Sequence, residues 1–103
     1  MVDKAIYEQV HQWMEAHKEN MIHDIQRIVK IPSISKPEEE IRPFGAACRQ
    51  VIDEMLQIGR EHGFYTENYE YYVGSIGEKE KKWDDVIGFW NHLDVVPVGE
   101  GWD

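Results

Sequence analysis

The sequence predicts an α/β fold in which two N-terminal helices pack on a partial sheet of about three strands. Apolar residues recur every three or four positions in the first part of the chain, which is typical of amphipathic helices. Aromatic and β-branched residues follow between 64 and 76, and an apolar run occupies 86–90. The 103 residues contain no repeat or linker, so we expect residues 1–103 to form a single partial domain.

The first helix is expected from Asp3 to about Lys30. Asp3 can cap its start, and Pro32 ends it because proline lacks an amide donor and disfavours helical geometry in the residue before it. Its apolar residues lie on one face, which we expect to be core. They are Ile6, Val10, Trp13, Met14, Met21, Ile22, Ile25, Ile28 and Val29.

A loop and a second helix come next. Residues 31–44 contain three of the four prolines and an acidic run at 38–40, which indicates a surface loop. Apolar residues between 45 and 62 again lie on one side, and Gly63 is suited to the left-handed cap that ends a helix. Cys48, on this helix, is the only cysteine. We expect it to be a buried small apolar residue, because one cysteine cannot form an internal disulfide.

Three strands are predicted after the second helix. The first two are expected near 64–69 and 71–76, where aromatic and β-branched residues suit a pleated surface. A charged turn at 77–85 leads to the apolar run 86–90, which reads as a strand buried on both faces. Such a strand needs neighbouring strands and covering helices that these residues do not supply, so we expect further chain to complete the layer.

The charge and composition exclude several partner classes. Twenty acidic and eleven basic side chains give a formal charge of -9, which repels phosphate backbones and anionic lipid. No apolar run has the length of a signal peptide or a membrane span. We therefore expect a cytoplasmic protein that binds neither nucleic acid nor membrane.

The candidate site follows the predicted third strand. Ligands in α/β sheets collect at this end of a strand. Residues two apart on an extended chain point to the same side, so His92 and Asp94 can face one site while Leu93 turns into the core. A metal-binding imidazole needs its second ring nitrogen held, commonly by a carboxylate. Asp94 is placed to hold His92, although a pair of this kind is also common in solvated loops.

The surrounding residues resemble a known motif. His-Leu-Asp-Val-Val-Pro at 92–97, followed by Gly-Glu-Gly-Trp at 99–102, is similar to the first metal motif of the co-catalytic zinc metallopeptidases. That family includes PepV-like bacterial dipeptidases, carnosinases, aminoacylases and succinyl-diaminopimelate desuccinylases. The chain most resembles the N-terminal segment of a PepV-like dipeptidase, the beginning of a three-layer α/β/α catalytic domain. Weaker similarity extends over residues 29–33, 43–45, 61–64 and 72–74.

The resemblance implies roles for two residues. In the family the histidine of the motif binds one of two zinc ions, and the aspartate orients it, which assigns metal binding to His92 and a catalytic supporting role to Asp94. Asn91 stands where the family usually has glycine or another small residue. The family's other ligands and its glutamate base lie beyond this sequence. A catalytic zinc needs about three protein ligands, so we expect the chain alone to bind zinc weakly or not at all and to be inactive.

The resemblance implies a zinc-dependent hydrolase acting on dipeptides or short amides. An amidohydrolase of the same fold that acts on N-acyl amino acids is an alternative, and no residue here separates the two. A non-catalytic interaction module whose aromatic strands bind a partner is a second alternative. Since an unpaired apolar strand edge tends to pair with another chain, we also expect the fragment to self-associate through strand edges.

Overall fold

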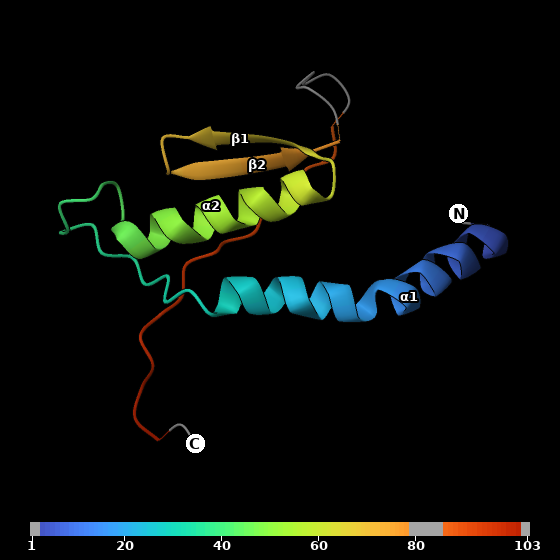
Figure 1. Cartoon of the computed structure of the whole chain (residues 1–103), viewed down its shortest axis with the longest axis horizontal. Helices are drawn as coiled ribbons and strands as arrows, with labels where there is room; N and C mark the ends of the chain where they lie inside the picture. The colour runs from blue at the N-terminus through green and yellow to red at the C-terminus, as the bar shows by residue number, and fades with distance from the viewer. Residues whose placement is uncertain (1–2, 79–85, 102–103) are drawn as a thin grey trace.

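The computed structural model describes residues 3–78 and 86–101, which form two helices and a two-stranded antiparallel sheet (Figure 1). Helix α1 spans Lys4–Val29, helix α2 spans Ala46–Glu61, and strands β1 and β2 span Tyr65–Tyr69 and Val73–Gly77. The predicted α/β class is therefore confirmed, with two strands in place of about three. Part of the predicted charged turn, at 79–85, lies outside the described residues, as does Trp102.

Helix α1 has the predicted bounds, but its apolar face is not core. The Asp3 carboxylate caps the helix by accepting a hydrogen bond from the Ala5 amide at 3.0 Å. No residue of α1 is buried, and its large apolar side chains, among them Trp13 and Met14, are exposed. Trp13, Met14 and Met21 line one side of a groove of about 510 Å³ that α2 borders on the other. The periodicity identified an apolar face correctly, but no described segment covers it.

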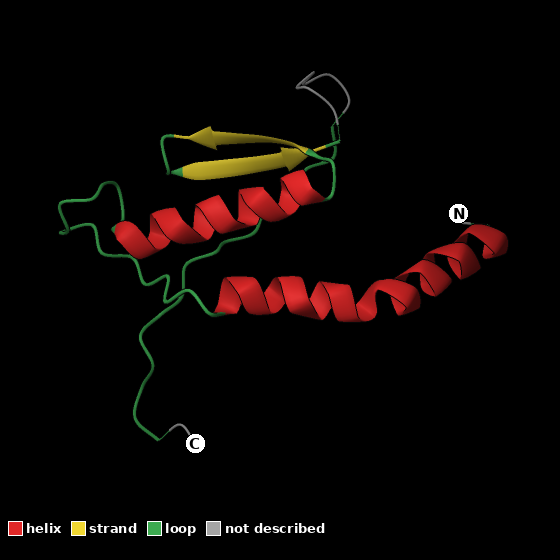
Figure 2. Ribbon diagram, viewed as in Figure 1, coloured by secondary structure: helices red, strands yellow, loops and turns green. Residues whose placement is uncertain are grey.

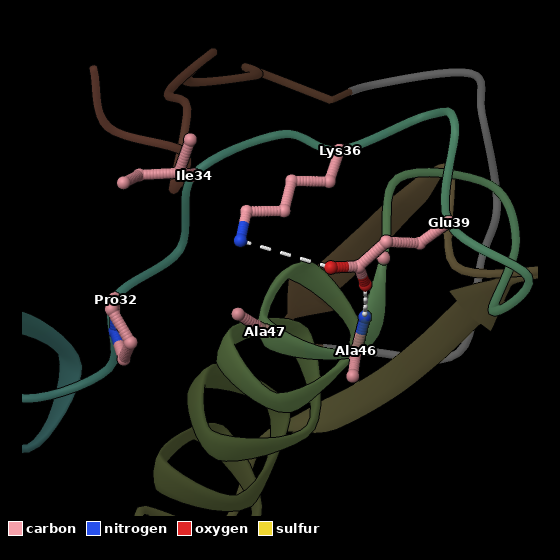
Figure 3. A pocket seen from close by; sticks show the side chains of 7 residues that line it. Pro32, Ile34, Lys36, Glu39, Ala46 and Ala47 are labelled. Atoms are coloured by element: carbon pink, nitrogen blue, oxygen red, sulfur yellow. Dashed lines mark hydrogen bonds and ion pairs between the residues drawn. The ribbon is translucent and has the colours of Figure 1, made fainter. Parts of the chain in front are cut away.

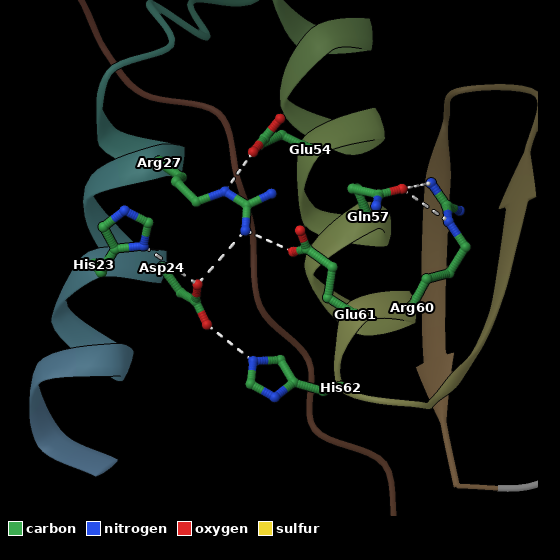
Figure 4. A network of polar contacts seen from close by, with 8 residues as sticks. All are labelled: His23, Asp24, Arg27, Glu54, Gln57, Arg60, Glu61 and His62. Carbon is green, nitrogen blue, oxygen red and sulfur yellow. Dashed lines mark hydrogen bonds and ion pairs between the residues drawn. The ribbon is translucent and has the colours of Figure 1, made fainter.

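A polar network joins the C-terminal half of α1 to α2 (Figure 4). The Arg27 guanidinium donates to the Glu54 carboxylate and to the Glu61 carboxylate, each at 2.6 Å. These two hydrogen bonds raise the pKa of Arg27 above its usual value, so it stays charged. One turn away, His62 contacts the Asp24 carboxylate at 2.9 Å. The two helices are thus held together at this end by charged groups that remain partly in solvent.

The small apolar core is formed mainly by residues of α2. This helix packs against the hairpin of β1 and β2 (Figure 2). Two glycines allow the close approach of helix and sheet. A Cβ at Gly59 would lie 3.1 Å from three side-chain atoms of Ile76, and one at Gly74 would lie 3.0 Å from Leu56 Cδ2. The buried apolar residues are Ile31, Cys48, Val51, Ile52, Leu56 and Ile58, which confirms the predicted burial of Cys48.

The hairpin turn is held by side chains instead of by glycine. Glu70 and Tyr71 both have positive φ, at 54° and 62°, a conformation that is uncommon for residues with a Cβ. The Asn68 side chain accepts a hydrogen bond from the Tyr71 amide at 2.8 Å, and the Tyr71 hydroxyl donates to Asp53 on α2 at 3.0 Å. Arg49 lies over the Tyr71 ring at 4.3 Å. The turn is therefore fixed against the helix beneath it.

The predicted third strand is wrong for this chain. Residues 86–90 form neither strand nor helix and are exposed, with Trp90 91 % exposed. A strand needs a neighbour for its backbone donors and acceptors, and the two-stranded sheet of the described residues does not extend to this segment. The apolar composition alone could not produce a buried strand.

The chain is less compact than a closed domain of its length. Its Cα radius of gyration is 16.8 Å, against about 13 Å for a compact domain of roughly 100 residues. The long α1 and the extended segment after residue 86 account for this difference (Figure 1). Within residues 3–78 and 86–101, no helix combines the length and apolar character needed to cross a membrane.

Candidate functional site

The segment that carries the predicted motif lies against the loop that follows α1. Val95 pairs with Ile34 in an isolated parallel bridge, and the Val95 amide donates to the Ser33 carbonyl at 3.0 Å. The Ser33 hydroxyl donates to the Leu93 carbonyl at 2.7 Å. Residues 93–95 are therefore tied to residues 33–34, which are some 60 positions earlier in the chain.

His92 and Asp94 lie on the same side of this segment and contact each other. Nδ1 of His92 lies 3.0 Å from the Asp94 backbone carbonyl oxygen and 3.3 Å from Asp94 Oδ1. The His92 side chain is 85 % exposed and that of Asp94 is 56 % exposed. Leu93, between them, is half-buried. The geometry leaves most of the imidazole open to solvent while its Nδ1 edge faces Asp94.

Among the described residues, His92 has the geometry of a single metal ligand, and no complete metal centre is assembled around it. In residues 3–78 and 86–101, no three side chains of His, Cys, Asp or Glu come together in a way that could hold a metal ion. A catalytic zinc takes about three protein ligands, so a zinc ion at His92 would need ligands from outside these residues. The chemistry of His92 suits that use, because a ring nitrogen held by a carboxylate and a carbonyl leaves the other nitrogen available.

Cys48 of α2 contacts the loop residue Ser33, which in turn contacts the motif segment. Its thiol is buried and lies 3.7 Å from the Ser33 carbonyl oxygen, toward which the S–H can donate. Burial raises the pKa of this thiol, and the nearby charges of Asp94 and Glu39 raise it further. A thiol in this state is a poor nucleophile and a poor metal ligand, so Cys48 belongs to the packing beneath the motif.

A hollow of about 230 Å³ lies beside this region, at the start of α2 (Figure 3). Its charged groups satisfy one another: the Glu39 carboxylate lies 3.8 Å from Lys36 Nζ and accepts a hydrogen bond from the Ala46 amide at 3.4 Å. Glu39, one of the three predicted loop glutamates, therefore supports the first turn of α2. The hollow presents no charged group free to bind a ligand.

The sequence pointed to His92 and Asp94 but not to the residues that hold them. Ser33, a buried polar residue, contacts the segment that carries the motif. No local pattern could have linked it to Leu93. His62, at the end of α2, pairs with Asp24 of α1.

Comparison with known proteins gives the relatives of this chain. A protein of Staphylococcus haemolyticus named "Putative dipeptidase" is 37 % identical over 97 residues, covering 88 % of this chain. Proteins with the same description from Staphylococcus epidermidis and Bacillus subtilis, the latter being YtjP, are 34 % and 36 % identical over 84 % and 82 % of this chain. This chain resembles dipeptidases. The expected relationship to dipeptidases is thus confirmed.

The match covers only part of each dipeptidase relative. The chain spans about a fifth of their length, between 18 % and 20 % for the three proteins named above. This share agrees with a chain that corresponds to an N-terminal segment of a longer enzyme. No family model matches the chain. No solved structure matches it significantly either.

Proposed function

We propose that this chain is the N-terminal part of the catalytic domain of a zinc-dependent dipeptidase and that His92 is one of its metal ligands. The observation that carries the proposal is the exposed His92 ring, whose Nδ1 lies 3.0 Å and 3.3 Å from two oxygens of Asp94. The names of the relatives support the dipeptidase part of the proposal. Zinc dependence rests on the motif and on the donor chemistry of His92.

The Asp94 backbone carbonyl oxygen can only accept a hydrogen bond, and the same holds for Oδ1 when the carboxylate is ionised. They therefore favour a proton on Nδ1 of His92, and the lone pair then lies on Nε2, at the exposed edge of the ring. A carboxylate behind a ligating imidazole also makes that nitrogen more basic. His92 would bind the metal through Nε2, and Asp94 would orient the ring.

Zinc, when bound by a completed site, polarises an amide carbonyl and activates a water molecule for attack. In this proposal the chain contributes one ligand and the residue that orients it, while the other ligands and the base come from the rest of the enzyme. Residues 1–103 by themselves are then inactive. The substrate is a dipeptide or a similar short amide, and the relatives' names favour this over an N-acyl amino acid.

The test uses the protein encoded by the full parent gene. Hydrolysis of a panel of dipeptides and of N-acetyl amino acids is measured before chelation, after chelation, and after zinc is restored. We expect dipeptide hydrolysis that chelation removes and zinc restores, with little turnover of N-acetyl amino acids. His92→Ala should abolish the activity.

The matched control is His11→Ala. It removes an exposed histidine of α1, which is far from the motif in the sequence. It should leave hydrolysis unchanged. Full dipeptide turnover in the His92→Ala enzyme would refute the role of His92, and turnover that survives thorough chelation would refute zinc dependence. Faster hydrolysis of N-acetyl amino acids would assign the enzyme to the acyl amino acid class.

A further inference from the structure

The buried hydroxyl of Ser33 contacts the segment that carries the candidate metal ligand. Ser33 is 1 % exposed, and its hydroxyl donates to the Leu93 carbonyl at 2.7 Å. Leu93 is the central residue of the tripeptide that carries His92 and Asp94. A buried hydroxyl without a partner is costly, so this hydrogen bond binds the two segments to each other.

A second contact fixes the orientation of the same segment. The Ser33 carbonyl accepts a hydrogen bond from the Val95 amide at 3.0 Å, and the Cys48 thiol approaches that carbonyl at 3.7 Å. The Leu93 carbonyl and the Val95 amide therefore both point toward Ser33. In an extended chain, residues two apart direct their backbone groups to the same side, and the residue between them directs its own to the opposite side.

This alternation places the Asp94 carbonyl on the side away from Ser33, where the His92 ring lies. His92 Nδ1 is 3.0 Å from that carbonyl oxygen. A carbonyl cannot donate a hydrogen bond, so a hydrogen bond at this contact needs a proton on Nδ1, and in the neutral ring Nε2 is then unprotonated. If the segment rotated about its axis, the Asp94 carbonyl would turn away from the ring.

We propose that Ser33 is a positioning residue that sets the tautomer of His92 by fixing the orientation of residues 93–95. The use of that tautomer in metal binding rests on the function proposed above. The tautomer itself is a property of this chain and can be measured without any metal. Failure of one claim therefore leaves the other open to its own test.

The experiment is a long-range ¹H–¹⁵N correlation spectrum of the histidine rings in the ¹⁵N-labelled chain. It is recorded without metal and well above the ordinary titration range of imidazole. The His92 signals are identified by their absence in His92→Gln. In the native chain we expect one protonated nitrogen at Nδ1 and one unprotonated nitrogen at Nε2. In Ser33→Ala the two ¹⁵N shifts should move toward each other, as in a ring that exchanges between tautomers.

Two variants separate positioning from simple loss of structure. Ser35→Ala makes the same change two residues along the same loop at an exposed position, and it should keep the native pattern. Ser33→Thr keeps the hydroxyl and should restore most of the separation lost in Ser33→Ala. An unchanged His92 pattern in a folded Ser33→Ala chain would overturn the proposal.

If Ser33→Ala does not fold, Ser33→Cys in reducing buffer keeps the volume but has only a weak donor. Averaged ring nitrogens in that chain would support the proposal, and a native pattern would overturn it. Metal analysis of the native parent enzyme separates the two claims. If it contains no zinc, while Ser33→Ala still changes the tautomer, the metal role of His92 is refuted and the positioning role of Ser33 stands.

Discussion

Replacing Gly59 by alanine should destabilise the chain, although alanine is the better helix former. The replacement gains up to about 1 kcal/mol of helix propensity. The new Cβ would lie 3.1 Å from Cγ1, Cγ2 and Cδ1 of Ile76. Because both γ carbons are in contact, a change of rotamer cannot relieve the crowding. Overpacking of this kind costs about 1–3 kcal/mol, so we expect a net loss of about 1 kcal/mol.

The same replacement should be stabilising when the neighbour is removed. Ile76→Ala deletes all three crowded atoms, so Gly59→Ala in that background should recover most of the gain in propensity, about 1 kcal/mol. The sign of the effect then depends on residue 76. The coupling between the two sites would be about 2 kcal/mol, within the range known for residues in contact.

Urea unfolding of the four chains, followed by far-UV circular dichroism and by tyrosine fluorescence, measures these free energies. Coincident transitions from the two probes justify a two-state treatment. Equal effects of Gly59→Ala in both backgrounds would refute the close packing of α2 on β2 described above. A stabilising effect in the native background would show that Ile76 can move away at little cost.

Three further predictions concern charge, burial and assembly. The hydrogen bond from His62, assisted by neighbouring cations, lowers the pKa of Asp24. The stability that the Asp24 carboxylate contributes is therefore present above the unfolded carboxyl pKa and is lost as the pH falls through the lower folded pKa. The urea midpoint should therefore fall more steeply between about pH 5 and 2 in the native chain than in Asp24→Asn, and parallel profiles would contradict this. Burial raises the pKa of the Cys48 thiol, so alkylation should be much slower in the native chain than in urea, and equal rates would argue against burial. Because the two-stranded sheet has no further strand on either side within the described residues, sedimentation velocity should show association that grows with concentration, whereas a clean monomer at high concentration would exclude it.

Local sequence patterns were sufficient to predict the two helices and the two strands β1 and β2. The three-to-four residue spacing defined both helices, and Gly63, with φ of 82°, ends the second as expected. The same spacing could not show whether an apolar face is covered. On α2 the face packs on the hairpin, while on α1 most of it stays exposed, and the difference depends on tertiary neighbours.

The prediction of a strand at 86–90 was wrong for a related reason. A strand depends on the backbone of a neighbour, and that neighbour cannot be inferred from the run itself. The spacing of His92 and Asp94 correctly predicted that both side chains lie on one side of the segment, while their role in a metal site stays a prediction. The support from Ser33 was not predictable, because it joins residues 60 positions apart through one hydroxyl.

The position of zinc in a crystal structure of the zinc-loaded parent enzyme tests the central claim most directly. We predict zinc bound to Nε2 of His92, with Nδ1 of the same ring facing Asp94 and the remaining ligands supplied from outside residues 1–103. Zinc bound through Nδ1, or an active site whose metal does not contact His92, would contradict the account.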